Sequence, residues 1–240
     1  MILITILLLA FLFLAVTAFC VFFDEAVIVR RHAFYRIQTQ DKIVALTFDD
    51  GPSADWTPQI LDVLKKHGVK ATFFMIGEHC LKYPEPAKRA ALEGHEIGNH
   101  TFDHHVLIYY KPDELVEEIK KSEKAIEEVT GKKTVLIRPP KAWLTAVEKK
   151  IINELGYKII LWSLNSKDWV NFNSRYIVRY LLHNVRPGDI ILFHDSGGVF
   201  TSEGGRRAET VKIVGTLIEK LSQKGYRFVT VSELLRLEGN

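Results

Sequence analysis

Thr47-Phe48-Asp49-Asp50-Gly51-Pro52 ends an apolar run and places two carboxylates side by side in front of a turn. Like charges in contact disfavour ionisation of both groups, so such a pair needs positive charge beside it. Two histidines in an H-x-x-x-H spacing, one isolated arginine and one isolated histidine follow later in the chain: His100, His104, Arg138 and His194. Together these residues indicate a metal site.

The chain has 240 residues, enough for one large or two small domains once the apolar N-terminus is set aside. It has no Pro/Ser-rich linker, low-complexity tract or repeat of fixed period, which favours one domain over residues 41–240. The 32 basic and 29 acidic residues are scattered, so nucleic-acid binding is not indicated, and nothing indicates a protein partner. Two cysteines, Cys20 and Cys80, exclude a disulfide framework.

Residues 2–23 carry no charge. The segment is longer than the ~7–15 residues of a signal-peptide core and approaches the ~20 that span a bilayer. We predict a membrane anchor over residues 1–23 and a juxtamembrane linker over residues 24–40. A cleavable signal stays open, because Val16 and Ala18 form a weak cleavage pattern, and the protein would then be secreted. Arg30, Arg31 and Arg36 follow the span, and by the positive-inside rule they favour a cytoplasmic domain.

Short apolar runs then alternate with amphipathic stretches, the pattern of an α/β domain. The predicted strands are 43–48, 71–76, 96–98, 134–138, 158–163, 189–193 and 226–231. The predicted helices are 57–66, 84–93, 112–129, 145–155, 174–184 and 208–224. A glycine follows most of these helices, as expected of a residue that ends a helix with positive φ: Gly68, Gly94, Gly131, Gly156 and Gly225.

Seven strand-helix units can close as a barrel or lie as an open twisted sheet. The polar motifs all follow strands, which gathers them at the rim where barrels of parallel strands build active sites. We therefore predict an α/β fold, a distorted (β/α) barrel of about seven strands, preceded by an N-terminal transmembrane helix.

A hydrolytic metal site needs three protein ligands and an open position for water. Asp50, His100 and His104 fit that requirement, and their place at strand ends supports an H-x-x-x-H spacing that is a weak signal alone. The predicted cofactor is one divalent ion, with zinc favoured and cobalt, nickel or iron compatible with the ligands.

The second aspartate of the pair supplies a base. Asp49 is the candidate to take a proton from water, and Arg138 could orient it. His194 follows an apolar run and could donate a proton to a departing amine, while Asp168 could raise its pKa. The other histidines are interpreted as surface or packing residues: His32, His67, His79, His95, His105 and His183.

Five motifs occur in order: 47–52, 100–104, Arg138-Pro139-Pro140, 162–169 and 192–195. With them the chain resembles the polysaccharide deacetylases, the NodB-homology family of carbohydrate esterases (family 4), from about Ile43 to Leu235. The resemblance implies the distorted barrel, and it implies the same metal ligands, base and acid as the reading of the residues.

The resemblance further implies that Arg138 orients Asp49 and that Asp168 tunes His194. It also assigns substrate contacts: Leu192 lines a pocket for the acetyl methyl, Trp169 walls the groove, and Pro139, Pro140 and Lys141 lie along the substrate. The main-chain N–H of Lys141 would serve the oxyanion.

Two departures stand out. Lys141-Ala142 replaces the aromatic residue and glycine that usually follow Arg-Pro-Pro, which should change the loop and the stacking of the sugar. Asn165 stands where the fourth motif often has aspartate, but Asp168-Trp169 is intact.

The expected activity is metal-dependent removal of N-acetyl groups from amino sugars of a polysaccharide, with peptidoglycan or a chitin-like glycan as substrate and acetate as product. The alternatives are a catalytically altered glycan-binding domain and an esterase or deformylase of another acylated sugar. Such glycans lie outside the cytoplasmic membrane, so we expect the domain to be extracytoplasmic on a single membrane-spanning segment, against the charge rule.

Overall fold

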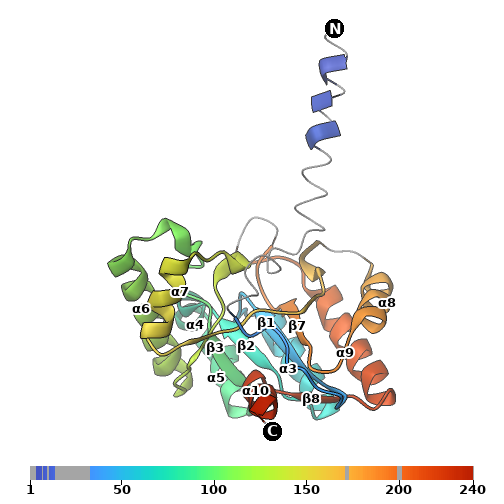
Figure 1. The fold of residues 1–240 in the computed structure, drawn as a ribbon. Coiled ribbons are helices and arrows are strands. Elements are labelled where there is room, and N and C mark those ends of the chain that lie inside the picture. Colours follow the sequence, from blue (N-terminus) through green and yellow to red (C-terminus); the bar gives the residue numbers. More distant parts are fainter. Residues whose placement is uncertain are drawn as a thin grey trace.

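The computed structural model describes residues 4–6, 8–9, 11–13, 33–170, 173–198 and 202–239 (Figure 1). Eight strands among these residues form one sheet with the order β5-β4-β3-β2-β1-β7-β6, and β8 also pairs with β1. All of these strand pairs are parallel. The strands are β1 Ile43–Asp49, β2 Thr72–Met75, β3 Glu96–Asn99, β4 Leu136–Ile137, β5 Lys158–Ile159, β6 Leu164–Asn165, β7 Ile190–His194 and β8 Arg227–Val229.

The longer helices form one continuous layer around the sheet, in which α3 contacts both α5 and α9, α6 contacts α5 and α7, and α8 contacts α9. Figure 1 shows α6 and α7 at one flank of the sheet and α8 and α9 at the other. The α-helices that pack around the sheet are α3 Trp56–His67, α4 Gly77–Lys82, α5 Pro84–Leu92, α6 Pro112–Thr130, α7 Ala146–Glu154, α8 Ser174–Asn184, α9 Ala208–Gln223 and α10 Val231–Arg236. Short 3-10 helices are η2 Leu107–Tyr109, η3 Pro140–Ala142, η4 Asp168–Val170 and η5 Leu237–Gly239. The six predicted helices are confirmed. At six residues each, α4 and α10 are too short to show a helical period, and they were not predicted.

The predicted glycine ends are also confirmed, because all five glycines have positive φ. The sheet is built around β1, whose seven residues are all buried. A strand covered on both faces reads as a continuous apolar run, as this one does up to its terminal aspartate. The ring of Phe48 stacks on Phe73 of β2 and on Phe193 of β7, at centroid distances of 4.9 and 5.8 Å. This packing fixes the three central strands whose ends carry the site.

The predicted barrel is confirmed only in a coarser form, as a distorted half-barrel. In the part of the chain that the structure describes, the sheet ends β5 and β6 are not paired with each other. The segment before β1 lies between β5 and the start of β7 instead, since Phe34 forms a bridge to Ile160 and Arg36 forms one to Asp189. The sheet is therefore curved and open at this point.

The predicted strand over 158–163 is wrong in its second half. It ends at Ile159, and β6 begins only at Leu164. The carbonyls of Ile160 and Leu161 turn toward the guanidinium of Arg138 and accept hydrogen bonds of 3.1 Å each. The predicted run thus contains only β5, and β6 follows it as an additional strand, so the described residues form eight strands where about seven were predicted.

The predicted membrane segment, residues 2–23, lies mostly outside the described residues. Its described pieces, 4–6, 8–9 and 11–13, are helical, and their large apolar side chains are exposed. Among the described residues, none of the helices has the length and apolar character needed to cross a bilayer. The end of the predicted linker packs on the domain: Ile37 is buried, and Arg36 Nη2 lies 2.6 Å from Asp189 Oδ1.

Close packing between β2 and β3 predicts opposite effects for two glycine substitutions. A Cβ on Gly98 would lie 2.4 Å from the buried ring of Phe74, so Gly98→Ala should destabilise the fold by about 1–3 kcal/mol. A Cβ on Gly215 of α9 meets only Val63, at 3.5 Å. Gly215→Ala should therefore stabilise the helix by about 0.5–1 kcal/mol. Urea denaturation measures both, and a Gly98→Ala midpoint equal to the wild-type midpoint would contradict the packing argument.

Candidate functional site

Three potential ligand side chains meet at the carboxyl ends of β1 and β3. Asp50 Oδ1 lies 3.1 Å from His104 Nε2 and 3.4 Å from His100 Nε2. One ligand atom from each residue lies within 4.8 Å of those of the other two, in the one such group found among the described residues. The structure therefore brings together the three ligands predicted from the sequence.

The backbone around this cluster adopts the left-handed conformation at three places: φ is 72° at Asp50, 68° at Thr101 and 63° at His104. Such residues persist where the surroundings hold them, and they concentrate at functional sites. Thr101 N–H donates to Asn99 Oδ1 at 2.8 Å, and His104 N–H donates to Thr101 Oγ1 at 3.1 Å. Ser122 Oγ donates to the Thr101 carbonyl at 2.8 Å. The histidine loop is thus held from both sides.

The cluster fits a divalent cation. His100 Nδ1 lies 2.6 Å from the Arg138 carbonyl, which holds the proton on Nδ1 and leaves the Nε2 lone pair facing Asp50. A lone pair and a carboxylate oxygen at 3.4 Å need positive charge between them. Two imidazoles and one carboxylate are also a common donor set for zinc and related ions.

Electrostatics at the cluster favour positive charge. Burial alone would lower the pKa of His100, but Asp49 and Asp50 outweigh it and raise that pKa. Burial would raise the pKa of Asp50, but His104 and His100 hold it well below its ordinary value. The charge that attracts a cation thus attracts protons as well, and ion uptake should displace protons.

The other aspartate of the pair is held by a buried arginine. Arg138 Nη1 donates to Asp49 Oδ1 at 2.7 Å and to Thr47 Oγ1 at 2.8 Å, and the arginine is fully buried. Burial lowers the pKa of Arg138, and the charge of Asp49 opposes that shift. The guanidinium also lies 4.1 Å from the ring centroid of Phe74. Asp49 is therefore fixed beside the ligand cluster, with Oδ2 3.9 Å from His100 Nε2.

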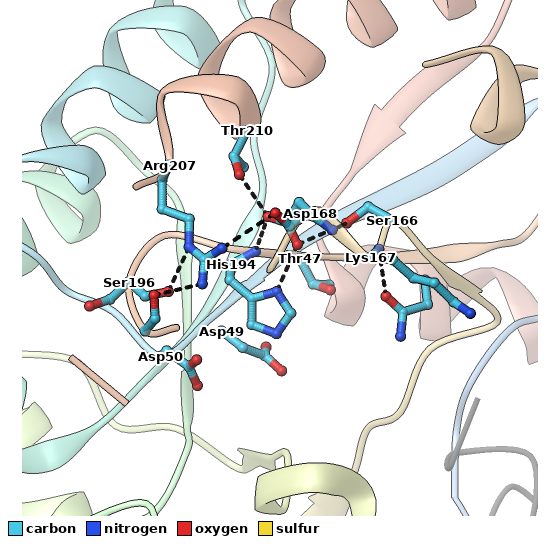
Figure 2. A network of polar contacts seen from close by, with 12 residues as sticks. Thr47, Asp49, Asp50, Ser166, Lys167, Asp168, His194, Ser196, Arg207 and Thr210 are labelled. Atoms are coloured by element: carbon cyan, nitrogen blue, oxygen red, sulfur yellow. Dashed lines mark hydrogen bonds and ion pairs between the residues drawn. The ribbon is translucent and has the colours of Figure 1, made fainter. Parts of the chain in front are cut away.

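A second buried carboxylate holds the predicted acid. Asp168 Oδ1 lies 2.8 Å from His194 Nδ1, and Asp168 Oδ2 accepts from the His194 N–H at 3.0 Å (Figure 2). Burial opposes the charge of Asp168, but His194 and further hydrogen bonds lower its pKa to about 2. Burial likewise disfavours the charged imidazole, and Asp168 outweighs it, so the pKa of His194 is raised.

The predicted substrate contacts lie around these pairs. Pro139 and Pro140 are buried and Lys141 is exposed, all just after Arg138. Trp169 is half-buried in η4, and Leu192 of β7 is buried beside Thr47 and Asn165 in the strand register. Their contacts with a substrate stay a prediction.

The structure shows how the backbone accommodates both departures from the family pattern, Lys141-Ala142 and Asn165. Lys141 and Ala142 have φ of 55° and 58°, so the loop keeps the left-handed turn that glycine would favour. A non-glycine residue there costs roughly 1–2 kcal/mol, and the buried methyl of Ala142 packs in a core cluster. Asn165 Oδ1 accepts from the Lys167 N–H at 2.8 Å, and either amide or carboxylate oxygen can make this turn.

Most of the remaining histidines behave as predicted, and His32 lies outside the described residues. His95 is buried, and burial lowers its pKa to about 4. His105 is exposed and pairs with Asp103. His79 is buried too, but its Nδ1 lies 2.7 Å from the main-chain oxygen of Asp50, so it supports a ligand residue.

Sequence reasoning missed Arg207, Thr210 and Asp195. Arg207 and Thr210 are buried and contact Asp168. Asp195 is buried beneath the aspartate turn, where Thr57 Oγ1 donates to its Oδ2 at 2.5 Å. Burial raises the pKa of Asp195 to about 7. For Asp195, the adjacency to His194 was a signal in the sequence. For Arg207 and Thr210 the sequence holds no such signal, because nothing in the local pattern shows that Arg207 is buried while its neighbour Arg206 is exposed.

The half-barrel, the Asp-His-His cluster and the two carboxylate-cation pairs at one rim define the carbohydrate deacetylase class. The family comparison agrees, because the polysaccharide deacetylase model matches residues 36–160. The chain belongs to the polysaccharide deacetylase family.

A peptidoglycan-N-acetylglucosamine deacetylase of Bacillus cereus is 39% identical over 204 residues, covering 84% of this chain and 92% of the relative. The crystal structure of the Bc1960 peptidoglycan N-acetylglucosamine deacetylase has a TM-score of 0.79 and 37% identity, covering 88% and 97% of the two chains. A carbohydrate esterase family 4 pseudoenzyme from Bacillus anthracis has a TM-score of 0.75 and 28% identity, covering 84% and 68%. Family members thus include both enzymes and a pseudoenzyme, so activity must be argued from the residues.

The contact between Asp168 and His194 predicts a change in the titration of the histidine. Asp168→Asn removes the charge that raises the pKa of His194 but keeps the burial that lowers it. The imidazole should therefore lose its proton at a lower pH than in the wild type, as measured by NMR titration of labelled histidine. Asp103→Asn is the control, because the Asp103 carboxylate contacts His105 and Tyr110 rather than His194. Equal His194 titration curves for wild type and Asp168→Asn would refute the assignment.

Proposed function

We propose that this protein hydrolyses the N-acetyl groups of amino sugars in a cell-wall polysaccharide, releasing acetate and leaving a free amine. The observation that carries the proposal is the arrangement at the rim. A base held by arginine and an acid held by aspartate flank a complete set of ligands for a divalent ion. The same rim of a parallel barrel is where enzymes of this architecture place their chemistry.

In this proposal Asp50, His100 and His104 hold the ion, with zinc favoured and cobalt, nickel or iron also suited to the donors. When bound, such an ion polarises the substrate carbonyl and lowers the pKa of water to about 7. The buried carboxylate of Asp50 and the two imidazoles supply this position without using Asp49, which stays available for proton transfer.

Asp49 is the proposed general base. The bond from Arg138 to Oδ1 leaves Oδ2 on the side of His100, where it can take a proton from the attacking water. Arg138 keeps the carboxylate from rotating and supports its charge. The proton therefore has a fixed acceptor beside the ligand cluster.

His194 is the proposed general acid. Since Nδ1 is bound to Asp168, the proton on Nε2 is the one that can pass to the amine nitrogen as the bond between carbon and nitrogen breaks. The main-chain N–H of Lys141 would donate to the oxyanion that forms on the acetyl carbon. Leu192 would contact the acetyl methyl, and Trp169 with Pro139 and Pro140 would border the sugar.

N-acetylglucosamine in peptidoglycan is the proposed substrate, on the basis of the Bacillus cereus relative. Other relatives are named chitooligosaccharide deacetylase and peptidoglycan-N-acetylmuramic acid deacetylase. Chitooligosaccharides and the N-acetylmuramic acid of peptidoglycan therefore both belong in the assay. The assay is mass spectrometry of acetate loss from defined muropeptides and chitooligosaccharides.

Three substitutions separate the proton acceptor from the ion site. Asp49→Asn should keep bound metal and lower acetate release by about 10²- to 10⁴-fold, because the amide oxygen can still accept from Arg138 but cannot take a proton from water. His104→Ala should lose both metal and activity. His105→Ala is the matched control, since its exposed ring pairs with Asp103 rather than with the cluster, and it should keep both.

Metal content is measured by elemental analysis and activity by acetate release. Normal turnover by Asp49→Asn would overturn the assignment of the base. Acetate release that survives chelation of metal would overturn the proposed ion dependence. A wild-type protein that binds these glycans but releases no acetate would instead be a glycan-binding domain, and release from other acylated sugars alone would indicate an esterase or deformylase.

We also propose that the domain acts outside the cytoplasmic membrane, attached through residues 1–23 or secreted if that segment is cleaved. The support is the location of cell-wall glycans and the uncharged N-terminal segment. Protease added to intact cells whose wall has been removed should degrade the domain. Protection of the domain under conditions that digest a known external protein would reverse this proposal.

A further inference from the structure

The carboxylate of Asp168 is held by four contacts, two on each oxygen. Oδ1 contacts His194 Nδ1 at 2.8 Å and accepts from Ser166 Oγ at 3.0 Å. Oδ2 accepts from the His194 N–H at 3.0 Å and from Thr210 Oγ1 at 2.8 Å. The contacts from Ser166 and His194 come from the same loop and from the end of β7. The contact from Thr210 comes from the first turn of α9, a separate element.

Arg207 stands directly before α9 and binds the same region through its guanidinium. Its Nε donates to the Ser196 carbonyl at 2.8 Å and its Nη2 to the Gly197 carbonyl at 2.7 Å. Its Nη1 lies 3.5 Å from the Asp168 carbonyl, at the limit of a hydrogen bond. The side chain is almost fully buried, and these three partners are all main-chain oxygens. Arg207 therefore joins the loop after β6 to the loop after β7.

Figure 2 shows Arg207 and Thr210 reaching this network from the side of α9, with the ring of His194 on the other side of Asp168. We propose that the start of α9 positions the proton donor: Thr210 and Arg207 fix Asp168, and Asp168 fixes the Nδ1 side of the His194 ring. Neither residue touches the reacting atoms, so both are positioning residues. The inference rests on the proposed function, in which His194 gives a proton to the amine.

Arg207 has a second effect that Thr210 lacks. The Gly197 carbonyl it holds belongs to a residue on which a Cβ would lie 2.3 Å from Asp50 Oδ2. The turn at Gly197 that Arg207 fixes thus packs directly against the carboxylate of Asp50, the proposed metal ligand. Thr210 should affect the acid alone, whereas Arg207 should affect the acid and the ligand cluster together.

The test compares Thr210→Val, Thr210→Ser and Thr216→Val in the full chain. Loss of one hydrogen bond to a buried carboxylate should lower kcat for acetate release about tenfold in Thr210→Val, with KM unchanged within twofold. Thr210→Ser keeps the hydroxyl and should restore kcat. Thr216 lies exposed on the same helix, so Thr216→Val is the matched control and should equal the wild type.

A signature that does not need activity is the NMR signal of the His194 Nδ1 proton, assigned by its loss in His194→Gln. It should broaden or move upfield in Thr210→Val and stay in place in Thr210→Ser. In Arg207 three separate nitrogens each reach a different carbonyl, whereas lysine offers a single nitrogen, so Arg207→Lys should also weaken metal binding. An unchanged kcat and an unchanged proton signal in Thr210→Val would overturn the inference. Wild-type protein without deacetylase activity would refute the proposed function, and the proton signal would still decide the positioning role.

Discussion

The ion pair between Arg138 and Asp49 is the interaction on which the rest of the rim depends. A fully buried guanidinium is costly unless its charge and its N–H groups all find partners. Arg138 finds them in Asp49, Thr47 and two main-chain carbonyls. These partners belong to β1 and to the segment after β5, so one side chain ties the centre of the sheet to its edge. Losing either charged partner of such a pair costs about 3–5 kcal/mol.

The proposed acid, His194, is held by a buried charge in the same way on the other side of β1. Asp168 is buried with its charge, and His194, Ser166 and Thr210 satisfy it. In the strand register Asp49 lies opposite His194, on neighbouring strands. Strands lie about 4.8 Å apart, so the sheet itself sets the separation of the two groups. A substrate carbonyl placed over this pair of strand ends would have a proton acceptor on one side and a donor on the other.

Local patterns in the sequence were enough to predict the places of most strands, the six long helices and the cluster of Asp50, His100 and His104. Each of these signals lies within its own short segment: one strand ends in aspartate, and the histidine pair directly follows another strand. Their place at the same rim then follows from the parallel order of the strands. The early end of the predicted strand 158–163 at Ile159 could not be foreseen, because it depends on Arg138, which lies 22 residues before Ile160. The contact of Thr210 with Asp168 spans 42 residues and likewise leaves no local trace.

The two adjacent aspartates can take the different roles proposed for them because their backbones differ. Successive residues of a strand point to opposite faces, so two aspartates in one extended strand could not both serve the same site. Asp49 is the last residue of β1 and reaches Arg138, whereas Asp50 leaves the strand with a φ of 72° and turns toward His100 and His104. This turn leaves little room: a Cβ on Gly51 would lie 2.2 Å from Asp195. The glycines beside the turn are therefore part of the site, since they leave room for the proposed arrangement, in which one carboxylate holds an ion and its neighbour takes a proton.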